Sequence, residues 1–226
     1  MRSVGPKIVT DGLILCLDPG NKKSYSGSGT VFYDLSKNNN GTLVNSPTFT
    51  TENKGEFTFN GSTNYISVDG FSNIMPWPVF TFCGWAKRQS SGQVNRAFCV
   101  TANTTSPVAS ISLSDSGAGF WSRGDANPQI LLYTGTILDN VWYYICGVSA
   151  GFSDAKLYLN GEFGAEDTST TRSSTLTVTR GTIGALRRST TSYEEGTVAC
   201  VQAYNRALSA AEIKQNYAAT KSRFGY

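Results

Sequence analysis

At 226 residues the chain is longer than an average domain but ordinary for one large β-sandwich. Nineteen basic residues against sixteen acidic ones leave a net charge of +3, and no cluster of basic residues stands out, so nucleic acid and anionic membranes are disfavoured as partners. The sequence contains no histidine, which removes the commonest general base and metal ligand.

Strand signals follow one another from residue 12 to residue 208. The runs are short, apolar or alternating, and they are separated by Gly, Asn or Asp, which is typical of all-β sandwiches. In residues 79–88 (VFTFCGWAKR), for example, Phe80 and Phe82 fall on one side of the strand, and Cys83 and Trp85 on the other. The predicted strand segments are 12–19, 55–61, 64–70, 79–88, 109–124 (two strands), 141–150, 155–166, 176–186 and 196–208.

The dipeptide Asn160-Gly161 is the strongest hairpin signal in the chain. It favours a type I′ turn, in which both central residues need positive φ. No repeat of fixed period is present, and no low-complexity linker divides the sequence. We therefore predict a single all-β domain over residues 1–226.

The chain ends in a predicted helix over residues 209–220. Ser209 and Glu212 have the spacing of a capping box, in which each side chain accepts a hydrogen bond from the backbone of the other residue. Leu208 and Ile213 are placed as a hydrophobic staple, and Tyr217 extends the apolar edge of the helix. The helix is therefore expected to dock on the strands.

Five widely spaced cysteines without a C-x-x-C motif argue against a disulfide framework and against a zinc site. Four of them fall inside apolar strand-like runs, so we expect buried, reduced thiols in a protein made in a cytoplasm. The N-terminus lacks a signal-peptide pattern and no apolar run reaches about 18 residues, which predicts a soluble chain without a secretion signal. The four cysteines are Cys16, Cys83, Cys146 and Cys200.

Several motifs then occur in a fixed order: FNGSTNYISV, FTFCGWAKR, WYYICGV, LYLNGE, TIGAL and AYNRALSAAEI. In this order they resemble the concanavalin A-like lectin/glucanase superfamily, in particular its laminin-G-like branch. The resemblance implies a jelly-roll sandwich of two antiparallel sheets, with a short C-terminal helix packed against it. Residues 5–45 and 216–226 resemble single-domain versions from tailed bacteriophages of marine and cyanobacterial hosts, which occur among virion structural proteins.

The resemblance raises the question of catalysis. Glucanases of the superfamily carry E-x-D-x-x-E or a close variant on one strand, and glycoside hydrolysis generally needs two carboxyl groups about 5–9.5 Å apart. The acidic pairs of this chain, in residues 162–167 (EFGAED) and 193–196 (YEEG), are expected to be solvated loop charges. A Ser–His pair cannot form without histidine. We therefore predict a protein that is not an enzyme.

Laminin-G-like domains often bind calcium, but the sequence disfavours such a site. The family pattern F-D-G-x-x-D-Y appears here as FNGSTNY, so that Asn60 and Asn64 replace the usual aspartates. Loss of two charges weakens a calcium site, and a plain turn at Asn60-Gly61 is the favoured interpretation. We predict no cofactor, with Asp18, Asp34 and Asp69 as the remaining calcium-ligand alternatives.

Glycan binding is widespread in the family and uses aromatic faces stacked on sugar rings. Trp85 and Trp142 lie in strongly apolar strands and are expected in the core. Other aromatics lie near polar or proline-rich segments, where buried packing or a protein contact is an equal alternative. The candidate glycan- or partner-binding residues are Tyr25, Trp77, Trp121, Arg123 and Tyr193, with Tyr133 as a further aromatic near a turn.

The resemblance implies a non-enzymatic bacteriophage virion protein, either a capsid decoration or accessory protein or a tail or fibre component. Its expected partners are other virion proteins and, with weak affinity, a host-surface glycan, without nucleic-acid binding or membrane insertion. A dedicated carbohydrate-binding lectin that recognises the host receptor is the alternative, and a degenerate glycoside hydrolase is the third. Residues 1–12 form either an arm that pairs with a neighbouring molecule or the lead-in to the first strand.

Overall fold

Strand β7 (Phe80–Arg88) shows how the sequence pattern builds two separate cores. The computed structural model describes residues 6–37 and 39–226. Phe80 and Phe82 of β7 point into the space between two sheets, whereas Cys83 and Trp85 point to the opposite face. Both sets are fully buried, so β7 contributes to a core on each side of its sheet.

The first sheet, called the back sheet here, contains eight strands in the order β14-β13-β12-β7-β18-β5-β4, with β1 also paired to β18. Each strand pair is antiparallel. Besides β7, its strands are β1 (Leu13–Leu17), β4 (Thr48–Thr50), β5 (Glu56–Asn60), β12 (Trp142–Ser149), β13 (Ala155–Leu159), β14 (Glu162–Asp167) and β18 (Glu195–Tyr204).

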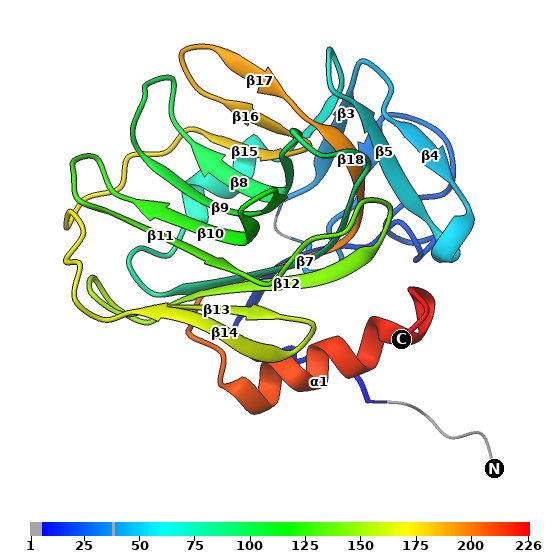
Figure 1. Cartoon of the computed structure of the whole chain (residues 1–226). Coiled ribbons are helices and arrows are strands. Elements are labelled where there is room, and N and C mark those ends of the chain that lie inside the picture. Colours follow the sequence, from blue (N-terminus) through cyan, green and yellow to red (C-terminus); the bar gives the residue numbers. More distant parts are fainter. Residues whose placement is uncertain (1–5, 38) are drawn as a thin grey trace.

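The second sheet, called the front sheet here, also has eight antiparallel strands, in the order β11-β10-β9-β8-β15-β6-β3-β2. A two-stranded hairpin, β16–β17, lies on the outside of this sheet (Figure 1). The strands of the front sheet are β2 (Val31–Phe32), β3 (Gly41–Val44), β6 (Tyr65–Ser67), β8 (Asn95–Thr101), β9 (Val108–Ser114), β10 (Gly117–Arg123), β11 (Gln129–Thr134) and β15 (Arg180–Ile183). The hairpin consists of β16 (Ala185–Arg187) and β17 (Thr191–Tyr193).

The two facing sheets enclose a phenylalanine-rich core. Phe82 contacts Phe80 and Phe98, with ring centroids 4.7 and 5.0 Å apart. The predicted jelly-roll sandwich of two antiparallel sheets with a short C-terminal helix is confirmed. So is the turn at Asn160-Gly161, whose φ values of 51° and 81° suit the type I′ hairpin between β13 and β14.

Helix α1 (Ala210–Thr220) lies on the outer face of the back sheet, beside β13 and β14 (Figure 1). Ser209 and Glu212 form the predicted capping box. The indole of Trp85 stacks on Phe224 with centroids 4.2 Å apart, and its Nε1–H donates to Thr220 Oγ1 at 2.8 Å. The helix thus seals a second core. The short 3-10 helices of the described residues are η1 (Glu52–Lys54), η2 (Asp69–Ile74) and η3 (Lys221–Arg223).

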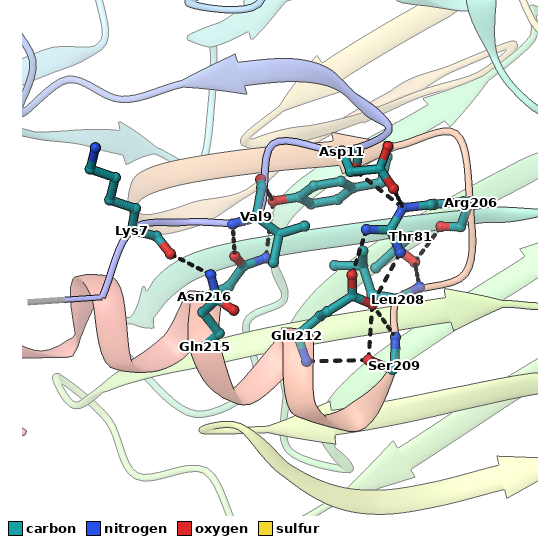
Figure 2. Close-up of polar contacts among 11 residues, drawn as sticks. Lys7, Val9, Asp11, Thr81, Arg206, Leu208, Ser209, Glu212, Gln215 and Asn216 are labelled. Atoms are coloured by element: carbon teal, nitrogen blue, oxygen red, sulfur yellow. Dashed lines mark hydrogen bonds and ion pairs between the residues drawn. The ribbon is translucent and has the colours of Figure 1, made fainter.

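The N-terminal segment runs between α1 and the back sheet of its own chain. Figure 2 shows the Val9 N–H donating to Asn216 Oδ1 at 2.7 Å, and Gln215 Nε2 donating to the Lys7 carbonyl at 2.8 Å. The hydroxyl of Tyr204 donates to the Val9 carbonyl at 3.0 Å. Residues 6–12 therefore lead into β1, while residues 1–5 of the predicted arm lie outside the described residues.

The motif YNRALS (residues 204–209) carries the family resemblance most specifically. Its residues hold helix α1 against the back sheet. The guanidinium of Arg206 donates to both carboxylate oxygens of Glu212, at 3.0 and 2.5 Å, and to the Asp11 carbonyl (Figure 2). The Leu208 N–H donates to Thr81 Oγ1 at 3.0 Å. Since each of these groups holds the helix to the sheet, the motif has a structural role.

All five cysteines are free and buried, which confirms the prediction for the four in apolar strands. Cys83 and Cys146 face each other across β7 and β12, with their sulfur atoms 2.8 Å apart. Burial raises the pKa of the Cys99 thiol to about 11. Among the described residues, no helix is both long enough and apolar enough to span a bilayer.

Candidate functional site

The outer face of the front sheet, called the front face here, is polar where the outer face of the back sheet is apolar. On β9, the core residues Ala109, Ile111 and Leu113 alternate with serines at 110, 112 and 114, which point outward. On β10, Phe120 points into the core, and Trp121 and Arg123 are half-buried on the outside. The front face is therefore a polar surface that carries a few large side chains.

Strand register brings residues from β8 to β11 into rows across this face. Arg96 is opposite Ser112, Ser112 is opposite Gly119, and Gly119 is opposite Tyr133. A Cβ atom on Gly119 would lie 3.1 Å from the Tyr133 ring, so the glycine leaves the space in which this ring lies. Tyr133 and its neighbour Leu131, each 42% exposed, form an open apolar strip at the edge of the sheet.

The β16–β17 hairpin lies above the rows and is anchored through its backbone. Cys99 Sγ donates to the Ala185 carbonyl at 3.2 Å, and Thr101 Oγ1 donates to the Arg187 carbonyl. The following residue, Arg188, places its guanidinium carbon 4.4 Å from the Trp121 ring centroid. The indole Nε1–H of Trp121 donates to Gln129 at 3.1 Å, which fixes the ring on which the guanidinium rests.

Five arginines gather on the front face and under the hairpin, and we call them the arginine cluster. Two of them have carboxylate partners: Arg96 pairs with Glu194, and Arg187 pairs with Asp69 at 2.7 Å. Burial lowers the pKa of Arg188, and the charges of Arg96 and Arg123 lower it further. The cluster consists of Arg96, Arg123, Arg180, Arg187 and Arg188.

Glu194 corrects an expectation from the sequence. The YEEG segment was expected to carry solvated loop charges, yet Glu194 is only 3% exposed. Its carboxylate accepts from the backbone N–H of Arg96 and from the guanidinium of the same residue. The expectation was wrong because the hairpin folds back over β8 and buries this carboxylate against an arginine. Glu162, in the other acidic segment, is exposed as expected and pairs with Lys214.

Three of the five candidate residues lie on the front face. Trp121 and Arg123 are on β10, and Tyr193 is on the hairpin strand β17, 6.2 Å from the Tyr65 ring. A hollow of about 320 Å³ opens between the hairpin and residues 92–96, and its lining includes Arg96, Leu186 and Tyr193.

The other two candidates lie elsewhere. The prediction for Tyr25 is wrong: its ring is 5% exposed and packs between Phe49 and Phe57, each 4.9 Å away, because the polar loop around it folds onto the core. Trp77 is half-buried at the start of β7, where its ring contacts Arg172 at 4.8 Å. It is not part of the front face. Trp85 and Trp142 are buried, as predicted.

The turn at Asn60-Gly61 is confirmed. The Asn60 side-chain oxygen accepts from the backbone N–H groups of Ser62 and Thr63, each at 3.0 Å, and Asn64 accepts from the Asn60 N–H at 3.0 Å. Hydrogen bonds within the turn thus engage both amide oxygens. The alternative calcium ligands are engaged as well, since Asp18 pairs with Arg223 and Asp34 accepts the Cys16 N–H at 2.8 Å.

Sequence reasoning missed Arg96, Arg188 and Glu194 as residues of this face. The adjacent Arg187-Arg188 pair, followed by a short polar turn and two glutamates, was the available signal. Alternation within a short hairpin sends neighbouring arginines to different sides. The sequence alone did not show that this hairpin folds over the sheet.

Comparison with solved structures shows the same fold. Trypanosoma rangeli sialidase superposes with a TM-score of 0.68 at 16% identity, over 99% of this chain and 37% of that protein. The receptor-binding domain of botulinum neurotoxin C/D mosaic serotype gives 0.68 at 14% identity, over 91% and 51% of the two chains. That of botulinum neurotoxin type G gives 0.64 at 13% identity, over 92% and 51%. The chain thus spans about a third to a half of these proteins.

Sequence comparison gives the family. No curated protein sequence matches the chain. The family profile described as "Concanavalin A-like lectin/glucanases superfamily", a laminin-G-like profile, matches residues 60–214, which is more than half of the chain. The matched segment runs from the end of β5 into helix α1 and includes every strand from β6 to β18. The chain therefore belongs to the concanavalin A-like lectin/glucanase superfamily.

Proposed function

We propose that this protein is a non-enzymatic adhesion module, carried on a tailed-phage virion, that binds glycans on its front face. The observation that carries the adhesive role is the exposed strip of Tyr133 and Leu131 beside the arginine cluster. Sugar rings present apolar C–H faces that stack on aromatic rings, and their hydroxyls accept hydrogen bonds from guanidinium groups. The front face offers both kinds of contact within two neighbouring strands.

The carboxylates paired with the arginine cluster support a role without catalysis. Glycoside hydrolysis needs two carboxyl groups that are free to exchange protons or to attack the sugar. Glu194 and Asp69 are instead each held by an arginine. Both therefore serve to position arginines on this face.

The relatives in fold support adhesion as well. Two are receptor-binding domains of botulinum neurotoxins, and the sialidase has been solved in complex with sialic acid. Since identity is at most 17% for these three structures, their activities come to this chain only as part of the proposal.

The glycan-binding part is tested with a glycan array and the Tyr133→Ala variant. We expect wild-type protein to bind a subset of glycans, and loss of the Tyr133 ring to lower affinity by about tenfold, because a stacked ring is worth about 1–1.5 kcal/mol. Tyr33→Ala is the matched control, since Tyr33 is 53% exposed and follows β2 at the opposite edge of the same sheet. Binding that is absent, or equal in all three proteins, contradicts the proposal.

The virion part rests on the resemblance of residues 5–45 and 216–226 to single-domain phage proteins. It is tested by quantitative mass spectrometry of purified virus particles, scaled to the major capsid protein. Hundreds of copies indicate a capsid decoration, and a few to a few tens of copies indicate a tail or fibre component. Absence from the particles contradicts the virion role and favours the alternative, a dedicated lectin.

A further inference from the structure

The arginine cluster on the front face carries more positive charges than it has carboxylate partners. The arginine cluster sets five positive charges against two carboxylates, Glu194 and Asp69. Arg180 donates to the Arg188 carbonyl at 2.6 Å, a neutral acceptor. Among the described residues, Arg123 and Arg188 have no carboxylate within ion-pair distance. The excess of three positive charges here equals the net charge of the whole chain.

The same arginines hold buried N–H groups without acceptors. Within residues 6–37 and 39–226, the Nε atoms of Arg96, Arg123 and Arg188 and the Nη2 atom of Arg188 are buried and make no hydrogen bond. A buried charged donor left unpaired is costly, so such groups are normally satisfied. Three arginines in one place with the same deficiency indicate that an acceptor from outside the chain belongs there.

The guanidinium of Arg188 is also positioned in advance. It rests on the Trp121 ring at 4.4 Å, and the carbonyl of the same residue is held by Arg180. A planar guanidinium fixed in this way loses little entropy when it binds the two oxygens of a carboxylate or sulfate group. The open strip of Tyr133 and Leu131 lies on β11, next to strand β10, which carries Trp121 and Arg123. This strip supplies the apolar surface for the sugar ring that carries such a group.

The mutual effect of the arginines points in the same direction. Burial, and then the charges of Arg96 and Arg123, lower the pKa of Arg188. Burial likewise lowers the pKa of Arg96. An anion bound between these side chains would offset both effects, because it neutralises the repulsion and accepts the unpaired N–H groups.

We propose that the front face selects anionic glycans, and that Arg123 and Arg188 bind a carboxylate or sulfate group on a sugar that lies against Tyr133. The inference rests on the proposed glycan-binding function and names its ligand class. Carboxylated and sulfated sugars share the chemistry that the guanidinium groups recognise, and the experiment below separates them.

The test measures binding of the whole chain to matched polysaccharides by biolayer interferometry. Polygalacturonate is compared with its methyl-esterified form, which has the same backbone without the charge, and dextran sulfate is compared with dextran. We expect at least one anionic polymer to bind about tenfold or more tightly than its neutral partner, with affinity falling as NaCl rises. Preference for the first pair identifies a carboxylate ligand, and preference for the second a sulfate ligand.

Variants separate the cluster from net charge. Arg123→Gln and Arg188→Gln should each lower binding to the anionic polymer by about tenfold. Arg188→Lys keeps the charge but loses the planar donor fork, and should lie between wild type and Arg188→Gln. Lys22→Gln, an exposed residue in the loop after β1, is the charge-matched control and should bind as wild type does. Thermal melts confirm that each variant is folded.

The outcomes distinguish the two proposals. Equal binding of charged and neutral polymers with loss in Tyr133→Ala overturns the anion preference and keeps the glycan-binding function. An effect of Lys22→Gln as large as that of the arginine variants also overturns the inference, because it shows a response to net charge alone. Binding to none of the polymers and none of the arrayed glycans overturns both.

Discussion

The two outer faces of the sandwich differ in their side chains: the back face is apolar and covered by α1, whereas the front face is polar. On the back sheet, Trp85 and Tyr144 are buried under α1, and Phe224, near the end of the chain, stacks on Trp85. On the front sheet, serines on β9 alternate with the core residues, and the short β16–β17 hairpin lies over β8 (Figure 1). Both sheets have eight strands, so the difference lies in the side chains and not in the architecture.

Under α1, the back face pairs buried donors with acceptors of the same chain. Asn216, which is fully buried, accepts from Val9 and donates to Tyr204 at 3.0 Å, and Trp85 donates to Thr220. The front face instead leaves arginine N–H groups unmatched. A face that satisfies its own groups contributes to stability, whereas a face with unmatched groups is the place to expect a ligand.

The largest expected effect comes from breaking the back face. Trp85→Ala removes an indole that contacts Phe224 and Tyr217 and leaves a cavity under α1, so we expect the free energy of unfolding to fall by about 3–5 kcal/mol. Urea denaturation followed by circular dichroism measures the loss. Leu131→Ala, on the open front face, should cost less than about 0.5 kcal/mol. Equal effects of the two variants would contradict the distinction between the faces.

The next effect comes from breaking the buried pair between Glu194 and Arg96. Glu194→Gln leaves Arg96, whose side chain is 13% exposed, without its counter-charge, and should cost about 2–3 kcal/mol. Chemical denaturation measures this value against Glu195→Gln, a half-buried neighbour without an ion pair among the described residues, which should change stability by about 0.5 kcal/mol or less. An unchanged free energy of unfolding in Glu194→Gln would show that Glu194 does not hold the arginine.

The sequence predicted the back face far better than the front face. The capping box at Ser209 and Glu212 and the apolar residues Leu208 and Ile213 are local signals, spaced within one or two helical turns, and all four are used as expected. Alternation along β7 also predicted correctly that Phe82 and Trp85 point to opposite sides of the strand. Local patterns therefore determine which faces are buried.

The front face depends on contacts between residues far apart in the chain. Arg96 and Glu194 are 98 residues apart, and the pairing of Arg188 with Trp121 needs the hairpin to cross the sheet. The candidates Trp121 and Arg123 lie on one face of β10, but the sequence did not show what lies above them. Tyr25 was misplaced for the related reason that a polar loop can carry one aromatic anchor into the core.

A smaller effect is the dependence of stability on pH that Glu212, on the helix covering the back face, contributes. The guanidinium of Arg206 and the backbone N–H of Ser209 lower the pKa of Glu212 to about 2, below its ordinary value of 4.5. A carboxyl group with a lowered pKa stabilises the fold at neutral pH, and this contribution is lost as the pH falls from about 4.5 through about 2. Glu212→Gln should therefore lower stability by about 1 kcal/mol at pH 7 and reduce the acid sensitivity.

Thermal melts between pH 2 and pH 7 measure this dependence. Glu162→Gln is the control, because Glu162 forms only an exposed pair with Lys214 and its replacement should leave the pH profile unchanged. A Glu212→Gln profile that falls as steeply as that of wild type would show that Glu212 is not the group responsible.

The smallest effect has the opposite sign and compares two adjacent arginines. Arg188→Met keeps an apolar stem on Trp121 but removes unmatched N–H groups and the repulsion from Arg123. It should therefore raise the free energy of unfolding by about 0.5–1 kcal/mol, which raises the melting temperature by about 1–4 °C. Arg187→Met breaks the pair with Asp69 and should lower stability by about 1 kcal/mol. If Arg188 served the fold, both variants would be destabilised. A gain at Arg188 together with weaker binding to an anionic glycan is expected only of a residue retained for its ligand.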